Sequence, residues 1–181
     1  MIVPLAPEVG NDWDALLRYH AAGHSYVSLT AAGDDSGLAV AMHRLADFRR
    51  QIALRAENLR LATSVADIRE AHRQGKLAVG LHLEGTECLE RDPNAIDLLY
   101  ALGVRHANLA FNRNNSAAGG CADLGNVGLS RLGRRYIERM NEVGMLLDLS
   151  HTSERASLEA IEASRAPVIF SHSNAHSLYP H

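Results

Sequence analysis

The segments Leu147-Asp-Leu-Ser-His151 and Val168-Ile-Phe-Ser-His172 decide the fold, because each is a short apolar run that ends in Ser-His. A third segment, Lys76-Leu-Ala-Val-Gly-Leu-His-Leu-Glu84, has the same form and ends on a carboxylate. Apolar runs followed by helix-like sequence are typical of buried parallel strands. Parallel barrels gather their active-site groups at the carboxyl ends of such strands. The sequence therefore predicts that these two histidines and this glutamate meet at one mouth of an α/β barrel.

Strand and helix patterns alternate along the rest of the chain. The strands are expected at residues 25–30, 58–62, 76–84, 104–111, 145–149 and 167–170, and the helices at 13–22, 36–55, 65–74, 93–102, 130–143 and 153–164. Each of these six strands except the last is followed by a helix, which favours a TIM-type (β/α) barrel. An open doubly wound sheet is the alternative. It would need a glycine-rich phosphate loop after an early strand, and none follows Leu29 or Leu61.

The length sets a limit on this barrel. The chain has 181 residues, 46% of them hydrophobic, which is enough for one domain over residues 1–181. A complete eight-stranded barrel needs about 250 residues, so we expect a partial barrel of about six strands. Its first and last strands, near Ser25 and Val168, should then have unpaired edges, and apolar side chains such as Val27 and Ile169 should lack cover. The chain is therefore expected to self-associate, for example as a homo-oligomer, or to be marginally stable unless a partner supplies the missing strands.

Composition and the N-terminal sequence limit the partners, the location and the cysteine chemistry that we expect for the protein. The net charge of −3 gives no sign of a nucleic-acid or anionic-membrane partner. The first residues have no basic region, and no apolar run reaches the roughly 18 residues of a membrane span, so a cytoplasmic protein is expected. Cys88 and Cys121 are expected to be free thiols rather than a disulfide or metal ligands, because neither belongs to a Cys-x-x-Cys pair.

A metal site is the chemistry that the strand ends suggest. Side chains alternate along a strand, so His82 and Glu84 point the same way. A buried strand-end carboxylate is costly unless it is paired or metal-bound, and histidine and glutamate are common zinc ligands. His82 lies one layer deeper and can be an extra ligand, a partner of a ligand or a core residue. Solvated or hydrogen-bonded structural roles are expected for His20, His24, His43, His72 and His106.

Two loops are expected near the same mouth and could contribute to the site. Residues 112–128 form a polar segment rich in glycine and asparagine that is too long for an ordinary strand-to-helix turn, so it is a candidate active-site lid. Asp34 and Asp35 follow an early strand and can be additional metal ligands or solvated loop residues.

Three segments resemble a known family. Gly80-Leu-His-Leu-Glu-Gly85, the residues 144–152 and the residues 166–175 are similar to the membrane dipeptidase, or renal-type dipeptidase, family of amidohydrolase-like barrels. The resemblance implies a zinc metallopeptidase with two zinc ions, in which Glu84 bridges both ions and His151 and His172 bind one of them. It also implies hydrolysis of dipeptides, often with a D-residue on the carboxyl side, by metal-activated water.

The chain also departs from the family pattern. The family supplies two further ligands from a His-x-Asp motif, and that motif does not occur in this sequence. Where the family has a substrate-binding histidine, the chain reads Leu109-Ala-Phe-Asn112, so Phe111 or Asn112 stands at that position. Asn112 is the candidate substrate-binding residue. We therefore expect a truncated member that supports one of the two zinc sites. The alternatives are another amidohydrolase-type metal hydrolase, acting on an amide, lactone or phosphoester, and a non-catalytic barrel fragment.

Overall fold

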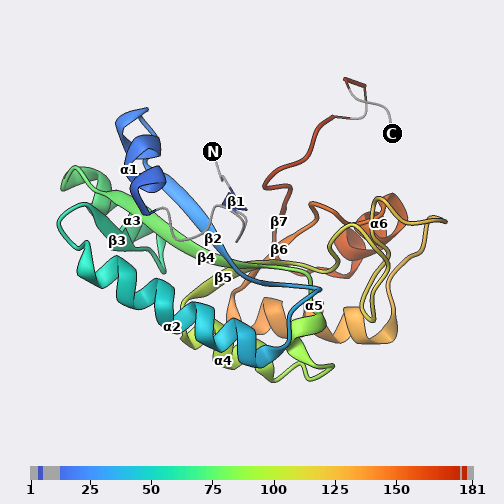
Figure 1. The fold of residues 1–181 in the computed structure, drawn as a ribbon. Helices are drawn as coiled ribbons and strands as arrows, with labels where there is room; N and C mark the ends of the chain where they lie inside the picture. Colours follow the sequence, from blue (N-terminus) through green and yellow to red (C-terminus); the bar gives the residue numbers. More distant parts are fainter. Residues whose placement is uncertain (1–3, 6–12, 176, 179–181) are drawn as a thin grey trace.

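The computed structural model describes residues 4–5, 13–175 and 177–178, and these form one sheet with helices packed against it (Figure 1). The sheet has seven strands, and every strand pair is parallel. The strands are β1 (Pro4–Leu5), β2 (Tyr26–Gly33), β3 (Leu59–Leu61), β4 (Leu77–Glu84), β5 (Val104–Asn108), β6 (Leu146–Asp148) and β7 (Val168–Ile169). The helices are α1 (Trp13–Ala21), α2 (Leu38–Leu54), α3 (Val65–Arg73), the 3-10 turn η2 (Glu87–Leu89), α4 (Ala95–Ala101), α5 (Arg131–Val143) and α6 (Glu154–Ala163).

Along the main path of the sheet, the order of the strands follows the chain without reversing. It runs β1-β2-β4-β5-β6-β7, with β3 paired to β4 beside this path. Doubly wound sheets need a point where the order reverses, so that alternative is wrong. β2 pairs with residues 78–84 of β4, while the other edge of β4 is shared between β3, at residues 77–79, and β5, at residues 81–84. β4 is therefore the central strand, and Glu84 lies at its carboxyl end.

The two faces of the sheet differ in polarity. Helices α2, α4 and α5 lie side by side along one face (Figure 1), and apolar side chains such as Leu45, Ile137 and Leu147 are buried between the layers. The opposite face, which is the concave interior, carries buried polar side chains on every second position of its strands. These are Ser28, Thr30, His82, Glu84, His106, Asn108 and Asp148. A polar interior is thus already packed within the described part of the chain.

Helix boundaries agree with the punctuation of the sequence. The hydroxyls of Ser64, Ser130 and Ser153 each accept a hydrogen bond from a backbone N–H in the first turn of α3, α5 and α6. Gly144 ends α5 with φ of 83°, a conformation that glycine adopts without strain. Asn11 and Asp12, whose residue types predict a cap for the first helix, lie outside the described residues.

Three expectations about the strands and helices were wrong. β1 adds a strand that pairs with β2 at Ser28 and Leu29, so the edge near Ser25 is not open, and Val27 is fully buried. β5 ends at Asn108 rather than at residue 111, because the backbone N–H of Phe111 donates a hydrogen bond to the side chain of Asp34 in another loop. α4 begins at Ala95 rather than at residue 93, after an Asp92 turn.

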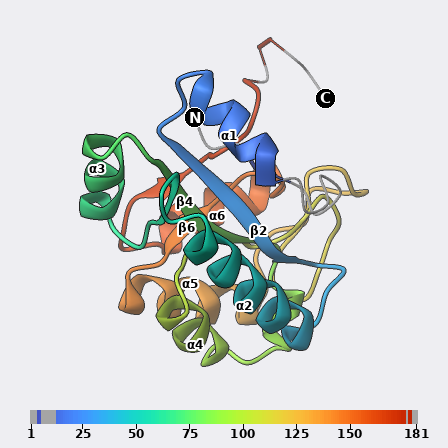
Figure 2. The ribbon, with the colours of Figure 1, turned by 60° about the vertical axis from the view of Figure 1, so that its left-hand side comes forward.

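The other end of the sheet does remain open in the part of the chain described. β7 pairs with β6 on one side, and no described strand pairs with its second edge. Phe170, just beyond β7, is 57% exposed. Figure 2 shows the segment after β7 running away from the sheet rather than along it. The expected self-association stays a prediction that this edge makes testable.

Candidate metal centre

Glu84, His151 and His172 meet at the carboxyl ends of the strands, as the sequence predicted. One ligand atom from each lies within 4.8 Å of the others. The two imidazole Nε2 atoms are 2.6 Å apart, and Glu84 Oε1 lies 3.7 Å from His172 Nε2. Glu84 is buried, while the two histidines are partly exposed. The cluster is thus anchored in the interior and open toward the mouth.

The backbone places the two histidines in equivalent positions. His151 is the third residue after β6 and His172 the third after β7, so neither strand itself ends on histidine. His151 has φ of 65°, the left-handed region that is uncommon for residues other than glycine. The backbone is held there because Cys121 N donates to His151 O at 2.8 Å. Backbone strain of this kind is concentrated at functional sites.

The remaining nitrogen of each imidazole has a partner on the side away from the cluster. His151 Nδ1 lies 2.8 Å from Asn112 Oδ1, which can only accept, so Nδ1 carries the proton. His172 Nδ1 lies 2.6 Å from Ser171 Oγ. That hydroxyl donates its one proton to the Asp148 carboxylate and therefore accepts from His172 Nδ1. Both Nε2 atoms thus direct lone pairs into the cluster.

The electrostatics favour the same protonation states. Burial alone would raise the pKa of Glu84, but the hydrogen bond from His82 and the nearby imidazoles outweigh it and lower this pKa. The Glu84 carboxylate is therefore ionised at neutral pH. Burial lowers the pKa of His151, and the neighbouring His172 lowers it further. His151 is thus neutral near pH 7, which is the form that binds a metal.

The donor set fits a divalent metal ion. The two Nε2 atoms are 2.6 Å apart with a carboxylate beside them, so their lone pairs and the carboxylate repel one another unless a cation lies among them. One carboxylate and two imidazoles are also a common protein ligand set for catalytic zinc, with the fourth position left to water. Glu84, His151 and His172 would hold one ion.

A second pair of histidines lies deeper in the interior. The rings of His82 and His106 stack with centroids 4.6 Å apart and an interplanar angle of 5°. Ser28 Oγ bridges them, at 2.8 Å from His82 Nδ1 and 3.2 Å from His106 Nε2, while Thr30 Oγ1 contacts His82 Nε2. His82 Nε2 is also 3.6 Å from Glu84 Oε1, so it is a neighbour of a ligand rather than one of the three donors.

The other histidines lie away from this centre. His106 is a hydrogen-bonded core residue, as expected. Four other histidines are partly or fully exposed, as expected of solvated side chains: His20, His24, His43 and His72. Cys88 and Cys121 are free thiols, also as expected.

Asn112 touches a donor of the cluster. Its φ is 62°, and its amide oxygen holds His151. The ring of Phe111 packs against the His151 ring with centroids 4.5 Å apart. The segment 112–128 therefore begins at a residue in contact with the metal centre and directly follows another, Phe111, as expected for a lid.

Asp34 is neither a member of the cluster nor a solvated loop residue. Its carboxylate accepts hydrogen bonds from the backbone N–H groups of Glu87 and Phe111 and from the side-chain amide of Asn115. Burial raises the pKa of Asp34, and these hydrogen bonds offset only part of the rise. A side chain at Gly85 would collide with this carboxylate. Asp34 thus ties the loops after β2, β4 and β5 together, while Asp35 is exposed.

Sequence reasoning missed Asp148. It is fully buried at the end of β6, and burial alone would raise its pKa. His106, Ser171 and two backbone N–H groups reverse that effect, so its pKa lies well below the ordinary value. A charged residue inside the apolar run 146–149 was the signal that could have indicated a structural role.

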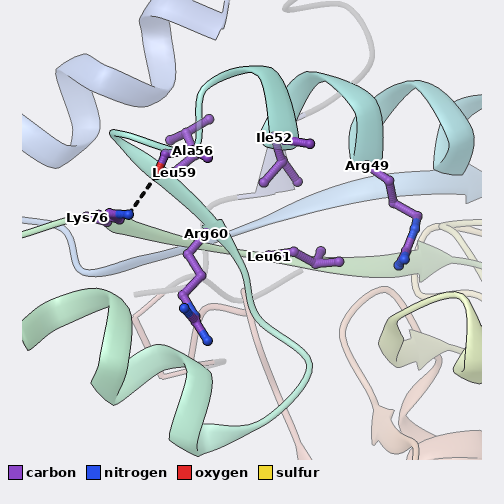
Figure 3. Close-up of a pocket in the computed structure, with 8 residues that line it drawn as sticks. Arg49, Ile52, Ala56, Leu59, Arg60, Leu61 and Lys76 are labelled. Atoms are coloured by element: carbon purple, nitrogen blue, oxygen red, sulfur yellow. Dashed lines mark hydrogen bonds between the residues drawn. The ribbon is translucent and has the colours of Figure 1, made fainter. Parts of the chain in front are cut away.

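Two cavities lie away from these donors. One, of about 340 Å³, lies between α2 and the start of β3 and is lined by Arg49, Arg60 and Lys76 around an apolar floor (Figure 3). The other, of about 410 Å³, lies between the segment 112–128 and α6. Neither has a donor of the metal centre in its lining.

Comparison with known proteins decides the family. The profile of the membrane dipeptidase family, peptidase family M19, matches residues 17–181. The chain belongs to this family. Dipeptidase tcpJ of Claviceps purpurea (strain 20.1) is 36% identical over 135 residues, which are 74% of this chain and 32% of that protein. The matched part of the chain therefore spans about a third of the length of this relative.

Solved structures agree in fold. An amidohydrolase from Pseudomonas aeruginosa superposes with a TM-score of 0.91 at 24% identity and covers 99% of this chain, which corresponds to 54% of that protein. A metallo peptidase from Rhodobacter sphaeroides, liganded with a phosphinate mimic of the dipeptide L-Ala-D-Ala, gives 0.81 at 22% identity over 91% of this chain and 57% of that one. The M19 chain thus has the fold of an incomplete TIM-type barrel, as predicted. None of its described helices is long and apolar enough to cross a membrane.

Proposed function

We propose that this M19 chain provides the metal-binding half of a zinc-dependent dipeptidase. The observation that carries the proposal is the convergence of Glu84, His151 and His172 with both Nε2 lone pairs directed inward. Family membership supports peptide-bond hydrolysis over lactone or phosphoester chemistry. The dipeptide mimic in the Rhodobacter structure supports a dipeptide as the substrate class.

The chain's own residues would divide the work as follows. Glu84 supplies a negative charge that is fixed in the interior by His82. The amide oxygen of Asn112 accepts a hydrogen bond from His151 Nδ1 and so keeps that nitrogen protonated. We propose that Asn112 also contacts the substrate. Zinc held by these donors would polarise the scissile carbonyl and lower the pKa of a water molecule to about 7. A cytoplasmic location remains a prediction.

We propose one zinc ion per chain. Among the described residues, one group of three side chains could hold a metal ion, and it contains Glu84. The sequence has no His-x-Asp motif for a second ion. Asp34, which could have substituted, is occupied by backbone N–H groups.

Hydrolysis of L-Ala-D-Ala by the zinc-loaded chain tests the function. We expect slow, zinc-dependent turnover, about 10²-fold or more below that of a full-length M19 enzyme, because electrostatic stabilisation by one lost group is worth about 10² to 10³ in rate. Glu84→Gln should remove it, whereas His43→Gln, at an exposed position, should not. Turnover equal to that of a full-length enzyme would show that further ligands are present, and turnover unchanged by Glu84→Gln would refute the proposed site.

A further inference from the structure

Asp148 lies behind the metal centre and contacts both loops that carry its histidines. Its Oδ1 accepts from the backbone N–H of Ser150 at 3.0 Å and from that of Ser171 at 3.1 Å. Ser150 directly precedes His151, and Ser171 directly precedes His172. One buried oxygen thus fixes the backbone of two loops that are separated by about twenty residues in sequence.

The second oxygen of the same carboxylate faces a side-chain relay. Asp148 Oδ2 accepts from the Ser171 hydroxyl, and His106 Nδ1 lies 3.5 Å from it. Because the Ser171 proton is directed to the carboxylate, the hydroxyl can only accept from His172 Nδ1. The charge on Asp148 therefore sets the direction of both hydrogen bonds, the one from the Ser171 hydroxyl and the one from His172 Nδ1.

We propose that Asp148 is a positioning residue that, through Ser171, keeps His172 in the tautomer with an unprotonated Nε2 and holds both histidine loops in register for metal binding. The inference rests on the proposed metal function of the cluster, but the tautomer part concerns the metal-free chain as well. Carboxylate partners of this kind usually orient a histidine ligand directly. Here Asp148 orients His172 indirectly, because the Ser171 hydroxyl lies between them and adds one hydrogen bond.

The substitution Asp148→Asn reverses the relay. An asparagine in the same place keeps one acceptor oxygen for the backbone N–H groups, but its NH₂ group donates to Ser171 Oγ. The hydroxyl then donates to His172 Nδ1, so the proton of the imidazole moves to Nε2 and blocks the metal. Ser171→Ala removes the relay without reversing it, and Ser171→Thr retains the hydroxyl.

Long-range ¹H–¹⁵N NMR of the full metal-free chain reads the tautomer, and a Co²⁺ titration followed by visible absorption reads the affinity. We expect His172 to carry its proton on Nδ1 in the parent and on Nε2 in Asp148→Asn. We expect Co²⁺ affinity to fall 10- to 100-fold in Asp148→Asn, less in Ser171→Ala and little in Ser171→Thr. Controls are Ser157→Ala, a buried serine in α6, and Asp97→Asn, which removes a carboxylate paired with Arg139.

An unchanged His172 tautomer in Asp148→Asn, or Co²⁺ affinity within about 3-fold of the parent in both Asp148→Asn and Ser171→Ala, overturns the inference. If Asp148→Asn does not fold, Ser171→Ala against Ser171→Thr decides by the same two readouts. A parent chain that binds no Co²⁺ refutes the proposed metal function instead, and the tautomer measurement then decides the inference by itself.

Discussion

Two pairs of histidines lie on the same concave face of the sheet, and they have opposite environments. In the pair at the mouth, His151 and His172, the Nδ1 atoms are held by neighbours and the Nε2 atoms face each other beside a carboxylate. In the interior pair, the rings of His82 and His106 stack, and three of their four nitrogens contact the hydroxyls of Ser28 or Thr30. The two pairs thus differ in what their free nitrogens face: both Nε2 atoms at the mouth face each other beside Glu84, which suits the proposed metal site, whereas the one interior nitrogen without a hydroxyl partner, His106 Nδ1, is buried.

The largest expected difference between the pairs is in metal binding. His172→Ala should remove the zinc, because it deletes one of three donors, whereas His106→Ala should leave about one zinc per chain. Elemental analysis of the dialysed parent and both variants measures this. Two tightly bound ions in the parent, or full retention in His172→Ala, would contradict the assignment of the donors.

The interior histidine His82 should instead have a large effect on the pH dependence of stability. Burial lowers the pKa of His82 to about 4 from 6.5, and Glu84 offsets only part of this effect. The unfolded chain therefore takes up a proton at about pH 6.5 that the folded chain accepts only near pH 4. The free energy of unfolding should fall by up to about 3 kcal/mol as the pH drops through this window, and no further from this group below it.

Urea unfolding of the chain in a chelator, between pH 7.5 and 4, tests this expectation. His82→Asn should flatten the dependence in that window, and His43→Gln, at an exposed position, should not. A free energy that rises on acidification in the parent would show that the buried imidazole is charged.

A smaller effect is expected from the hydroxyl that bridges the interior pair. Ser28→Ala leaves two buried ring nitrogens without this partner, which should cost about 1 to 3 kcal/mol of stability and leave zinc binding unchanged. Ser25→Ala is the matched control, because Ser25 contacts His72 at 3.4 Å on the surface. Equal losses in the two variants would mean that the bridge contributes nothing specific to the interior.

The mouth was predictable from the sequence, and much of what supports it was not. Glu84, His151 and His172 follow apolar runs, so the rule that strand ends converge in a barrel brought them together. The charge of Asp148 inside an apolar run could have indicated a structural role, but its partners depend on how two loops fold back onto one carboxylate, which no local pattern encodes. The strand β1 has two residues, too few for any periodicity.

The end of β5 shows why boundaries near the mouth could not be read. The run through Phe111 is apolar and continues the strand pattern, but the Phe111 N–H bonds the Asp34 carboxylate from another loop. A long-range contact thus overrides the local preference. The same turn places the Phe111 ring against His151 and so serves the site.

Anomalous diffraction at the zinc edge, from crystals of the parent chain grown with zinc, tests the central claim most directly. We predict one strong peak per chain, bound by a carboxylate oxygen of Glu84 and by Nε2 of both His151 and His172, and no peak beside His82 or His106. A peak that involves the interior pair, or the absence of a peak at Glu84 while zinc is bound elsewhere on the chain, would contradict the account.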